Sequence, residues 1–200
     1  MDLKGKKVLV FGAGKSGIGA ADLLGSVGAQ PIIYDGNENL DKEAVLHKTN
    51  GTYTPEIWAG AFPEGEMESL DLVVLSPGVP TDLPLVKSFY EKGLPVWSEV
   101  ELAYRTGKGE VLAITGTNGK TTTTALLGKI MGDARESVFV VGNIGTAYTS
   151  KSLEMREDSV TVAEISSFQL ETIEQFRPKV RAILNITEDH LNRHHTMAEY

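Results

Sequence analysis

The sequence contains no cysteine among its 200 residues and no long, uninterrupted apolar run. The first absence excludes disulfides and thiol chemistry, and it fits a reducing compartment such as the cytosol. The second excludes a membrane-spanning helix, which needs about 18 or more apolar residues in succession. The apolar segment after the basic N-terminus stops at Phe11, which is too short for a secretory signal. We therefore expect a cytoplasmic protein without a membrane span.

Positive charge is also scarce. The chain has 19 Lys and Arg against 27 Asp and Glu, for a net charge of −8 and a pI near 5.1. This balance argues against broad nucleic-acid binding, and we expect no nucleic-acid partner. It does not exclude a phosphate ligand, because backbone N–H groups, one lysine and Mg²⁺ act locally. The 41% apolar content is enough for ordinary cores in one or two domains.

Apolar, β-rich segments alternate with helical patterns, which predicts an α/β fold with parallel sheets covered on both faces. The fold predicted is a Rossmann-like domain over residues 1–97, followed by a phosphate-loop α/β domain over 98–200 that has no clear ending. The expected strands are 7–11, 31–34, 71–75, 94–97, 111–115, 138–141, 160–165 and 180–186. The expected helices are 16–27, 38–48, 83–92, 99–105, 121–131 and one near 170–175, and a further helix would begin close to Tyr200.

A nucleotide phosphate loop is indicated by Gly116-Thr-Asn-Gly-Lys-Thr-Thr122, between an apolar strand and a helix-forming segment. Loop N–H groups and a helix N-terminus attract a polyphosphate, Lys120 would reach the β- and γ-phosphates, and Thr121 would hold Mg²⁺. A full Walker A pattern has glycine where this chain has Ile114, so the loop is a short variant. The alternative is a glycine-containing turn with a surface lysine.

A second glycine cluster, Gly12-Ala-Gly-Lys-Ser-Gly17, follows the first expected strand and opens a helix. With Asp35 at the end of the next strand, it resembles a dinucleotide-binding fingerprint, in which the acid contacts a ribose. NAD(P), FAD and nucleotide sugars can all place a pyrophosphate there, and Lys15 and Ser16 add polar groups. Alternatively, the glycines only permit close packing of the strand and helix.

Glu164 and His190 each follow an apolar strand and should approach the edge where the phosphate loop lies. Together with Thr121 they suit a divalent ion that also touches phosphate oxygens. The alternatives are a buried, paired carboxylate for Glu164 and a helix-start histidine for His190. We expect His194 and His195 to be solvated helix residues.

Four segments together resemble the Mur ligase family: Gly116–Thr122, Gly142–Gly145, Glu164–Leu170 and Asn185–His194. Within that family, Ser166–Leu170 and the glycine-rich opening are similar to the members that add D-glutamate to UDP-N-acetylmuramoyl-L-alanine. The resemblance implies an ATP- and Mg²⁺-dependent ligase of peptidoglycan synthesis that acts through an acyl phosphate. It also implies that the first domain binds the UDP of the substrate, not NAD.

The site residues are carried over from the same resemblance. UDP and pyrophosphate would contact Lys15, Ser16, Asp35, Gly36, Asn37 and Gly78. ATP phosphates would contact Gly116, Thr117, Asn118, Gly119, Lys120, Thr121 and Thr122. One Mg²⁺ would be held by Thr121 and Glu164 and a second by His190, with Lys120, Glu164 and His190 as the catalytic set. Asn143, Ser166 and Gln169 would line the path of the muramoyl-alanine group.

Two features depart from the family pattern. Asn192 stands where the family motif has aspartate, which weakens a charge role at that position. Family members are also roughly twice as long, and a lysine that is carbamylated in them would fall beyond Tyr200. We therefore expect an inactive N-terminal portion of a monomeric ligase.

Two other functions stay open on sequence grounds. An NAD(P)-dependent oxidoreductase would use Gly12–Gly17 and Asp35, but it leaves the Lys120 loop unexplained. A non-catalytic nucleotide-binding module would keep both phosphate-binding loops without releasing phosphate. A folylpolyglutamate-synthase-like ligase shares the ATP loop, but the Gly12–Gly17 cluster argues against it.

Overall fold

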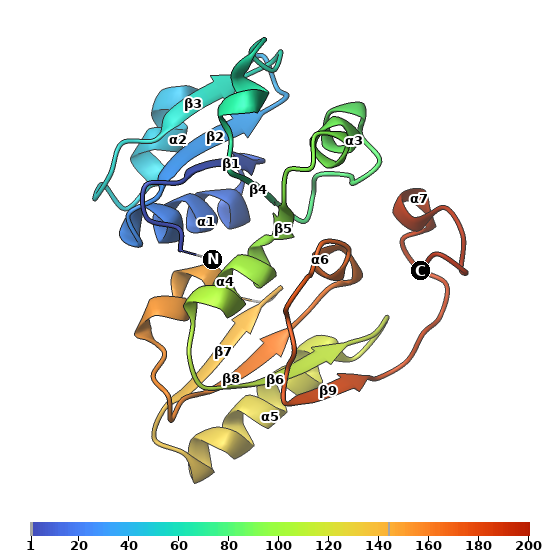
Figure 1. The fold of residues 1–200 in the computed structure, drawn as a ribbon. Helices are drawn as coiled ribbons and strands as arrows, with labels where there is room; N and C mark the ends of the chain where they lie inside the picture. The colour runs from blue at the N-terminus through green and yellow to red at the C-terminus, as the bar shows by residue number, and fades with distance from the viewer. Residues whose placement is uncertain (1, 144) are drawn as a thin grey trace.

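The structure is a computed structural model that describes residues 2–143 and 145–200. It contains two parallel sheets, one above the other in Figure 1, joined by a single helix. The predicted α/β class with parallel sheets is therefore confirmed. No helix within the described ranges is long and apolar enough to cross a membrane.

The first unit is a five-stranded sheet in the order β3-β2-β1-β4-β5. Its strands are β1 (Lys7–Phe11), β2 (Gln30–Asp35), β3 (Glu56–Ala59), β4 (Leu72–Leu75) and β5 (Val96–Ser98). Its helices are α1 (Lys15–Ser26), α2 (Lys42–Lys48), the 3₁₀ turn η1 (Glu66–Ser69) and α3 (Pro84–Glu91). All strand pairs are parallel, so both faces must be covered by helices.

Side chains of β1 alternate between two buried cores. Val8 and Val10 face the core that α1 covers, while Leu9 and Phe11 face the core that Phe89 of α3 enters. This period of two along the apolar residues 8–11 is what a sheet buried on both faces requires.

The second unit is a four-stranded sheet in the order β7-β8-β6-β9, again with parallel pairs. Its strands are β6 (Glu110–Thr115), β7 (Val138–Gly142), β8 (Val160–Glu164) and β9 (Val180–Ile183). Its helices are α5 (Lys120–Ala134), α6 (Ser167–Leu170) and α7 (Leu191–His194), with the 3₁₀ turns η2 (Tyr148–Ser150) and η3 (Ser152–Glu154).

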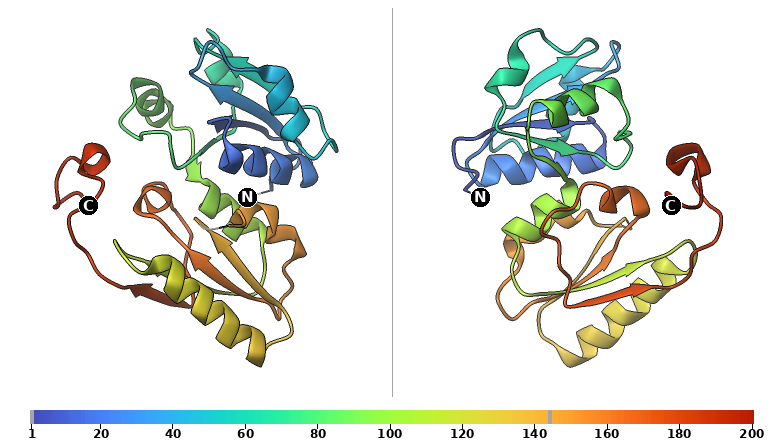
Figure 2. Two further views of the ribbon diagram at one scale, coloured as in Figure 1. Left: turned by 180° about the vertical axis from the view of Figure 1, so that it is seen from behind. Right: turned by 45° about the vertical axis from the view of Figure 1, so that its right-hand side comes forward.

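The connecting helix α4 (Glu99–Thr106) contributes to both units. Leu102 belongs to a core of the first sheet, whereas Val100 and Ala103 belong to a core of the second. The views in Figure 2 place α4 between the two sheets. The boundary at residues 97 and 98 stays a prediction, because this helix follows it and packs on both sides.

A carboxylate of α4 determines the conformation of the segment after α6. Glu101 is fully buried and accepts hydrogen bonds from the backbone N–H groups of Glu174, Gln175 and Phe176, at 3.0, 2.8 and 2.9 Å. Burial alone would raise the pKa of Glu101, but these donors and Arg105 outweigh it and hold the pKa below its usual value. The helix expected near 170–175 is therefore wrong, because Glu101 takes three N–H groups from this region.

Three other element predictions need correction. The strand β3 was not expected; it is short, lies at the sheet edge and follows Pro55. The helix expected from residue 38 begins only at Lys42, because Asp41 caps it by accepting from the N–H of Ala44 at 2.9 Å. The strand expected over 180–186 ends at Ile183, before the chain turns toward the loop after β6.

Candidate functional site

The loop between β6 and α5 has a shape that only glycine supports at two points. Gly116 and Gly119 have φ of +132° and +83°, and a Cβ on Gly116 would lie 2.9 Å from the carbonyl oxygen of Asn185. Ile114, where the longer motif has glycine, is a buried β6 residue paired with Glu164. Strand β6 therefore continues through position 114, and the loop begins at Gly116, two residues later than in the full motif.

Asn185 holds the first half of this loop. The N–H groups of Thr117 and Asn118 donate to the backbone and side-chain oxygens of Asn185, at 3.0 and 2.9 Å. The Asn185 amide in turn donates to the Asn118 carbonyl at 2.9 Å. Sequence reasoning gave Asn185 no role, because it placed this residue inside the strand expected over 180–186, whereas β9 ends at Ile183.

The second half of the loop presents positive charge. The first helical hydrogen bond of α5 runs from Thr123 to Gly119, so the N–H groups of residues 120–122 point beyond the helix start. Lys120 folds over the loop, where its Nζ donates to the Gly116 and Thr117 carbonyls at 2.6 and 2.9 Å. Free N–H groups, a helix N-terminus and one ammonium group together suit a polyphosphate.

Glu164 lies between this loop and the end of β7. Its Oε2 accepts from Thr121 Oγ1 at 2.9 Å and its Oε1 from Asn143 Nδ2 at 3.2 Å, and the residue is 2% exposed. The strand order explains why these three side chains lie together, because β6, β8 and β7 are neighbours and their carboxyl ends share one edge. A carboxylate and a hydroxyl beside a phosphate loop are oxygen ligands of the kind that Mg²⁺ uses with nucleotides, so these two residues fit the metal.

His190 does not join this pair. It caps α7 with φ of +51°, its side chain is 51% exposed, and its ring centroid lies 4.9 Å from that of Phe168. Within the described ranges no three His, Asp or Glu side chains come together as a metal site. The expected gathering of Thr121, Glu164 and His190 is therefore present only for the first two.

The neighbouring histidines differ from each other. The side chain of His194 is 9% exposed, and its Nε2 lies 2.8 Å from Ser167 Oγ, so the expectation of a solvated residue is wrong for it. His195 is 60% exposed, as expected. Sequence could not separate them, because the difference depends on how α7 packs against α6.

A cleft of about 630 Å³ opens at the carboxyl edge of the first sheet. Seven of the residues expected to bind UDP or the muramoyl-alanine group line it: Lys15, Ser16, Asp35, Gly36, Asn37, Gly78 and Asn143. Asn143 comes from the second unit, and Lys15 Nζ donates across to the Gly145 carbonyl at 2.6 Å. The cleft is therefore formed by both units, at the strand ends where open α/β sheets bind ligands.

Asp35 shapes one wall of this cleft. Its Oδ2 accepts from the Ala13 N–H and its Oδ1 from the Asn37 N–H, both at 3.0 Å. The carboxylate thus fixes the glycine-rich turn and the loop after β2 relative to each other. Each carboxylate oxygen keeps a lone pair that can accept from a ligand hydroxyl.

Ser166 and Gln169 lie outside the cleft. They form a capping box at the start of α6, and Gln169 is 1% exposed. The Gln169 amide donates to Glu99 Oε1 at 2.6 Å, and its oxygen accepts from the Ser166 N–H at 2.8 Å. Burial raises the pKa of Glu99, which the Gln169 hydrogen bond partly offsets. The pair supports α6, and its predicted contact with the muramoyl-alanine group stays a prediction.

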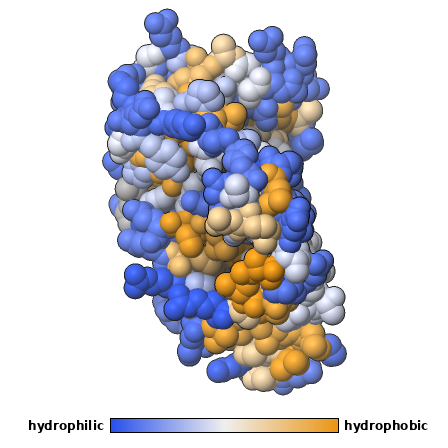
Figure 3. All heavy atoms as spheres, turned by 90° about the vertical axis from the view of Figure 1, so that its right-hand side faces the viewer, coloured by the Kyte–Doolittle hydropathy of each residue, from blue (hydrophilic) through white to orange (hydrophobic). Residues whose placement is uncertain are grey.

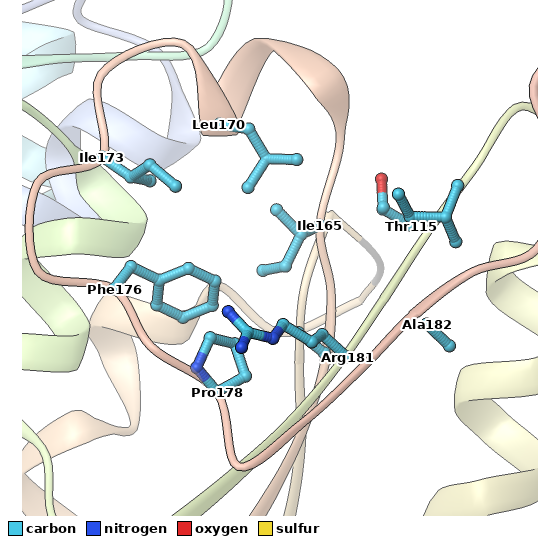
Figure 4. A pocket seen from close by; sticks show the side chains of 10 residues that line it. Thr115, Ile165, Leu170, Ile173, Phe176, Pro178, Arg181 and Ala182 are labelled. Carbon is cyan, nitrogen blue, oxygen red and sulfur yellow. The ribbon is translucent and has the colours of Figure 1, made fainter.

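The second unit also has an apolar cavity of about 270 Å³, shown in Figure 4. Ile165, Phe176 and Ile183 are among its lining residues, and Arg181 is its one charged side chain. Apolar residues gather on the lower half of the face in Figure 3. Exposed apolar side chains of the second unit include Leu126, Ile130, Val180, Ile183 and Ile186. The apolar cavity in Figure 4 lacks convergent polar groups, so we place the candidate site at Glu164 instead.

Comparison with known proteins gives two family matches. Residues 6–98 match the N-terminal domain described as Mur ligase MurD-like, and residues 114–200 match the Mur ligase middle domain. Two solved structures share the fold. A UDP-N-acetylmuramate:L-alanyl-gamma-D-glutamyl-meso-diaminopimelate ligase from Neisseria meningitides has a TM-score of 0.54 at 18% identity, over 94% of this chain and 63% of that one. The UDP-N-acetylmuramate-alanine ligase from Thermotoga maritima has a TM-score of 0.50 at 24% identity, over 97% and 45%.

Curated relatives match over the whole chain. A protein named UDP-N-acetylmuramoylalanine--D-glutamate ligase from Lachnospira eligens is 60% identical over 200 residues, and one of the same name from Clostridioides difficile is 47% identical over 201. The chain covers 44% of the length of each. With the two domain matches, this similarity shows that the chain belongs to the Mur ligase family.

Proposed function

We propose that the full-length protein containing this chain is an ATP-dependent ligase that joins D-glutamate to UDP-N-acetylmuramoyl-L-alanine in peptidoglycan synthesis. The names of the relatives at 46–60% identity support this reaction. The observation that carries the proposal is the position of Glu164. One carboxylate oxygen contacts Thr121 beside the phosphate loop, and the other contacts Asn143 in the cleft. A single side chain therefore connects the proposed ATP and UDP-substrate sites.

The proposed chemistry begins with the carboxylate of the bound substrate attacking the γ-phosphorus of ATP. ADP leaves, and an acyl phosphate forms on the substrate. The amine of D-glutamate, after its ammonium form has lost a proton to solvent, attacks the acyl carbon. The tetrahedral intermediate collapses to the amide with loss of phosphate and of one more proton from nitrogen. This sequence requires charge neutralisation and in-line positioning more than acid–base chemistry.

Residues of the chain would supply both the charge neutralisation and the positioning. Lys120 and the N–H groups of residues 120–122 would neutralise phosphate charge, after Lys120 turns away from its two loop carbonyls. Thr121 and Glu164 would hold Mg²⁺, which, when bound, draws charge from the phosphate oxygens. The cleft lined by Lys15, Ser16 and Asp35 would hold the UDP group. With α7 in its present position, His190 does not join the Thr121–Glu164 pair, because its ring packs against Phe168.

The chain spans less than half of the relatives' length, so we propose that residues 1–200 alone bind nucleotide but do not complete the reaction. The proposed setting is the cytoplasm, where ATP is available, and the proposed state is a monomer.

The reaction is tested by phosphate release from the full-length protein. We expect release only with ATP, UDP-N-acetylmuramoyl-L-alanine and D-glutamate together, with L-glutamate as the matched control. Titration with UDP and with NADH separates the competing functions, since binding of NADH but not UDP would favour an oxidoreductase. Nucleotide binding without phosphate release under any combination would favour a non-catalytic module.

Glu164→Gln tests the residue that carries the proposal. Glutamine keeps the size of the side chain but removes the charge, so we expect kcat to fall by about 10²- to 10³-fold. Glu154→Gln is the control, because Glu154 is an exposed carboxylate paired with Lys151. Equal kcat values for the two variants would contradict the proposed role of Glu164.

A further inference from the structure

A partly buried ion pair lies where the first unit meets α7. Arg193 Nη2 donates to Glu171 Oε2 at 2.7 Å and to the Val79 carbonyl at 2.9 Å. Thr81 Oγ1 donates to the same Glu171 oxygen at 3.0 Å. The side chains of Arg193 and Glu171 are 13% and 18% exposed, so water screens their charges only weakly. Four residues from three separate segments thus share one small network.

One end of this network is part of the substrate cleft. Val79 lines the cleft together with its neighbours Gly78 and Pro80. Because Arg193 binds the Val79 carbonyl and Glu171 binds the Thr81 hydroxyl, the loop over residues 78–81 cannot move without disturbing both charged residues. Any ligand that fixes this loop therefore also favours one position of Arg193.

The Arg193 end of this network contributes to the position of α7. The Arg193 guanidinium carbon lies 4.9 Å from the Phe168 ring centroid, and the His190 ring packs on the same phenyl group. The helix has only four residues. A helix this short has little stability of its own and depends on tertiary contacts for its position. Arg193 supplies contacts of this kind to both α6 and the first unit.

We propose that Arg193 and Glu171 are positioning residues that couple occupation of the UDP cleft to the placement of α7 and His190. This inference rests on the function proposed above. UDP binding in the cleft would order the 78–81 loop, and the loop would hold Arg193 and with it the histidine-bearing helix. Substrate binding would then prepare the second side of the site before phosphoryl transfer.

Amide hydrogen exchange of the full-length protein tests the coupling, with UDP as the probe. In the unsubstituted protein we expect UDP to slow exchange over residues 190–196, a segment that does not line the cleft. Thr81→Val keeps the shape of the side chain but loses the hydroxyl, and Arg193→Met loses the charge. Both variants should still bind UDP yet show less protection over 190–196. Arg156→Met is the matched control, because Arg156 pairs with Asp158 on the surface.

Kinetics distinguish positioning from a purely structural role. Removing a charge-assisted hydrogen bond should raise the KM for the UDP substrate by about tenfold and lower kcat, with the KM for Mg·ATP unchanged. Arg193→Lys keeps the charge opposite Glu171 and should recover part of the loss. A purely structural role predicts a lower melting temperature and fewer active molecules, with the same KM.

The outcomes separate this inference from the proposed function. If UDP binds and exchange over residues 190–196 does not change, the coupling is overturned while the ligase assignment stands. If UDP does not bind, the assignment of the cleft falls and the coupling falls with it. If UDP slows amide exchange over residues 190–196 as much in Thr81→Val and Arg193→Met as in the unsubstituted protein, the coupling is also overturned.

Discussion

Gly17 shows how tightly single residues are constrained in the first unit. A Cβ built on Gly17 would lie 1.8 Å from the Gly12 carbonyl oxygen, which is backbone and cannot move aside cheaply. The glycine therefore lets α1 start directly against the turn that borders the cleft. Its neighbour Gly14 has open space around the same position.

We predict that Gly17→Ala destabilises the protein by about 2 kcal/mol or more, because the new methyl group overlaps a backbone atom. Gly14→Ala is the matched control and should change the free energy of unfolding little. Urea denaturation of both variants measures the difference. Equal stabilities would show that the turn relaxes around the methyl group, contrary to this account.

Motif residues could be predicted from the sequence, but their contacts could not. The glycines and Lys120 of the phosphate loop stand out because their chemistry is local to one segment. Asn185 binds the loop near Asn118 and Gln169 binds Glu99, and no local pattern gives these distant partners. The sequence therefore predicted the glycine-bearing loop with Lys120, whose binding of a phosphate stays a proposal, and it did not predict that Gln169 lies outside the cleft.

At the scale of elements, the alternation of apolar strands and helices was enough to predict most of both sheets. The failures arose where tertiary contacts decided the local structure. Residues 170–175 have a helical pattern, yet the Glu101 carboxylate binds the N–H groups of Glu174, Gln175 and Phe176. The strand β3 was missed because a four-residue edge strand has too few side chains to show a period.

The helix α4 makes stability depend on pH through Glu99. Burial raises the pKa of Glu99 above the ordinary value of 4.5. A carboxyl group of this kind stabilises the folded state below its unfolded pKa, and that contribution is lost as pH rises toward the folded pKa. Glu101 has the opposite sign, because its pKa is lowered and its contribution is lost as the solution becomes acidic.

We therefore predict that Glu99→Gln becomes stabilising relative to the natural residue as pH rises above about 4.5, since glutamine has no proton to lose. Its amide oxygen can still accept from Gln169. Urea denaturation from about pH 5 to about pH 8 measures the difference in unfolding free energy. A difference that stays constant with pH would mean that Glu99 does not titrate in this range.

At the scale of the whole molecule, α4 links the two sheets, because Leu102 enters one core while Val100 and Ala103 enter the other. Both tryptophans, Trp58 and Trp97, lie in the first unit. Trp97 Nε1 also donates to Glu174 Oε2 at 3.0 Å, so tryptophan fluorescence reports the first unit and its contact with that segment. Circular dichroism reports both units. The two signals can therefore reveal whether the units unfold together.

We predict coincident thermal transitions by fluorescence and circular dichroism for residues 1–200. Leu102→Ala should lower stability by about 2–5 kcal/mol, because it leaves a cavity beneath α4, and should shift both signals together. The exposed Leu126 provides a control of the same type, and Leu126→Ala should have little effect. Transitions at separate temperatures would show that each sheet folds independently of α4.

The most direct test of the central claim is the affinity of the full-length protein for Mg·ATP with Lys120 replaced by alanine. Lys129→Ala is the control, because Lys129 is an exposed lysine of the same helix. If Lys120 and the adjacent loop amides bind the nucleotide phosphates, Lys120→Ala should weaken Mg·ATP binding by about tenfold or more and leave UDP binding intact. Unchanged Mg·ATP affinity in Lys120→Ala would contradict the account.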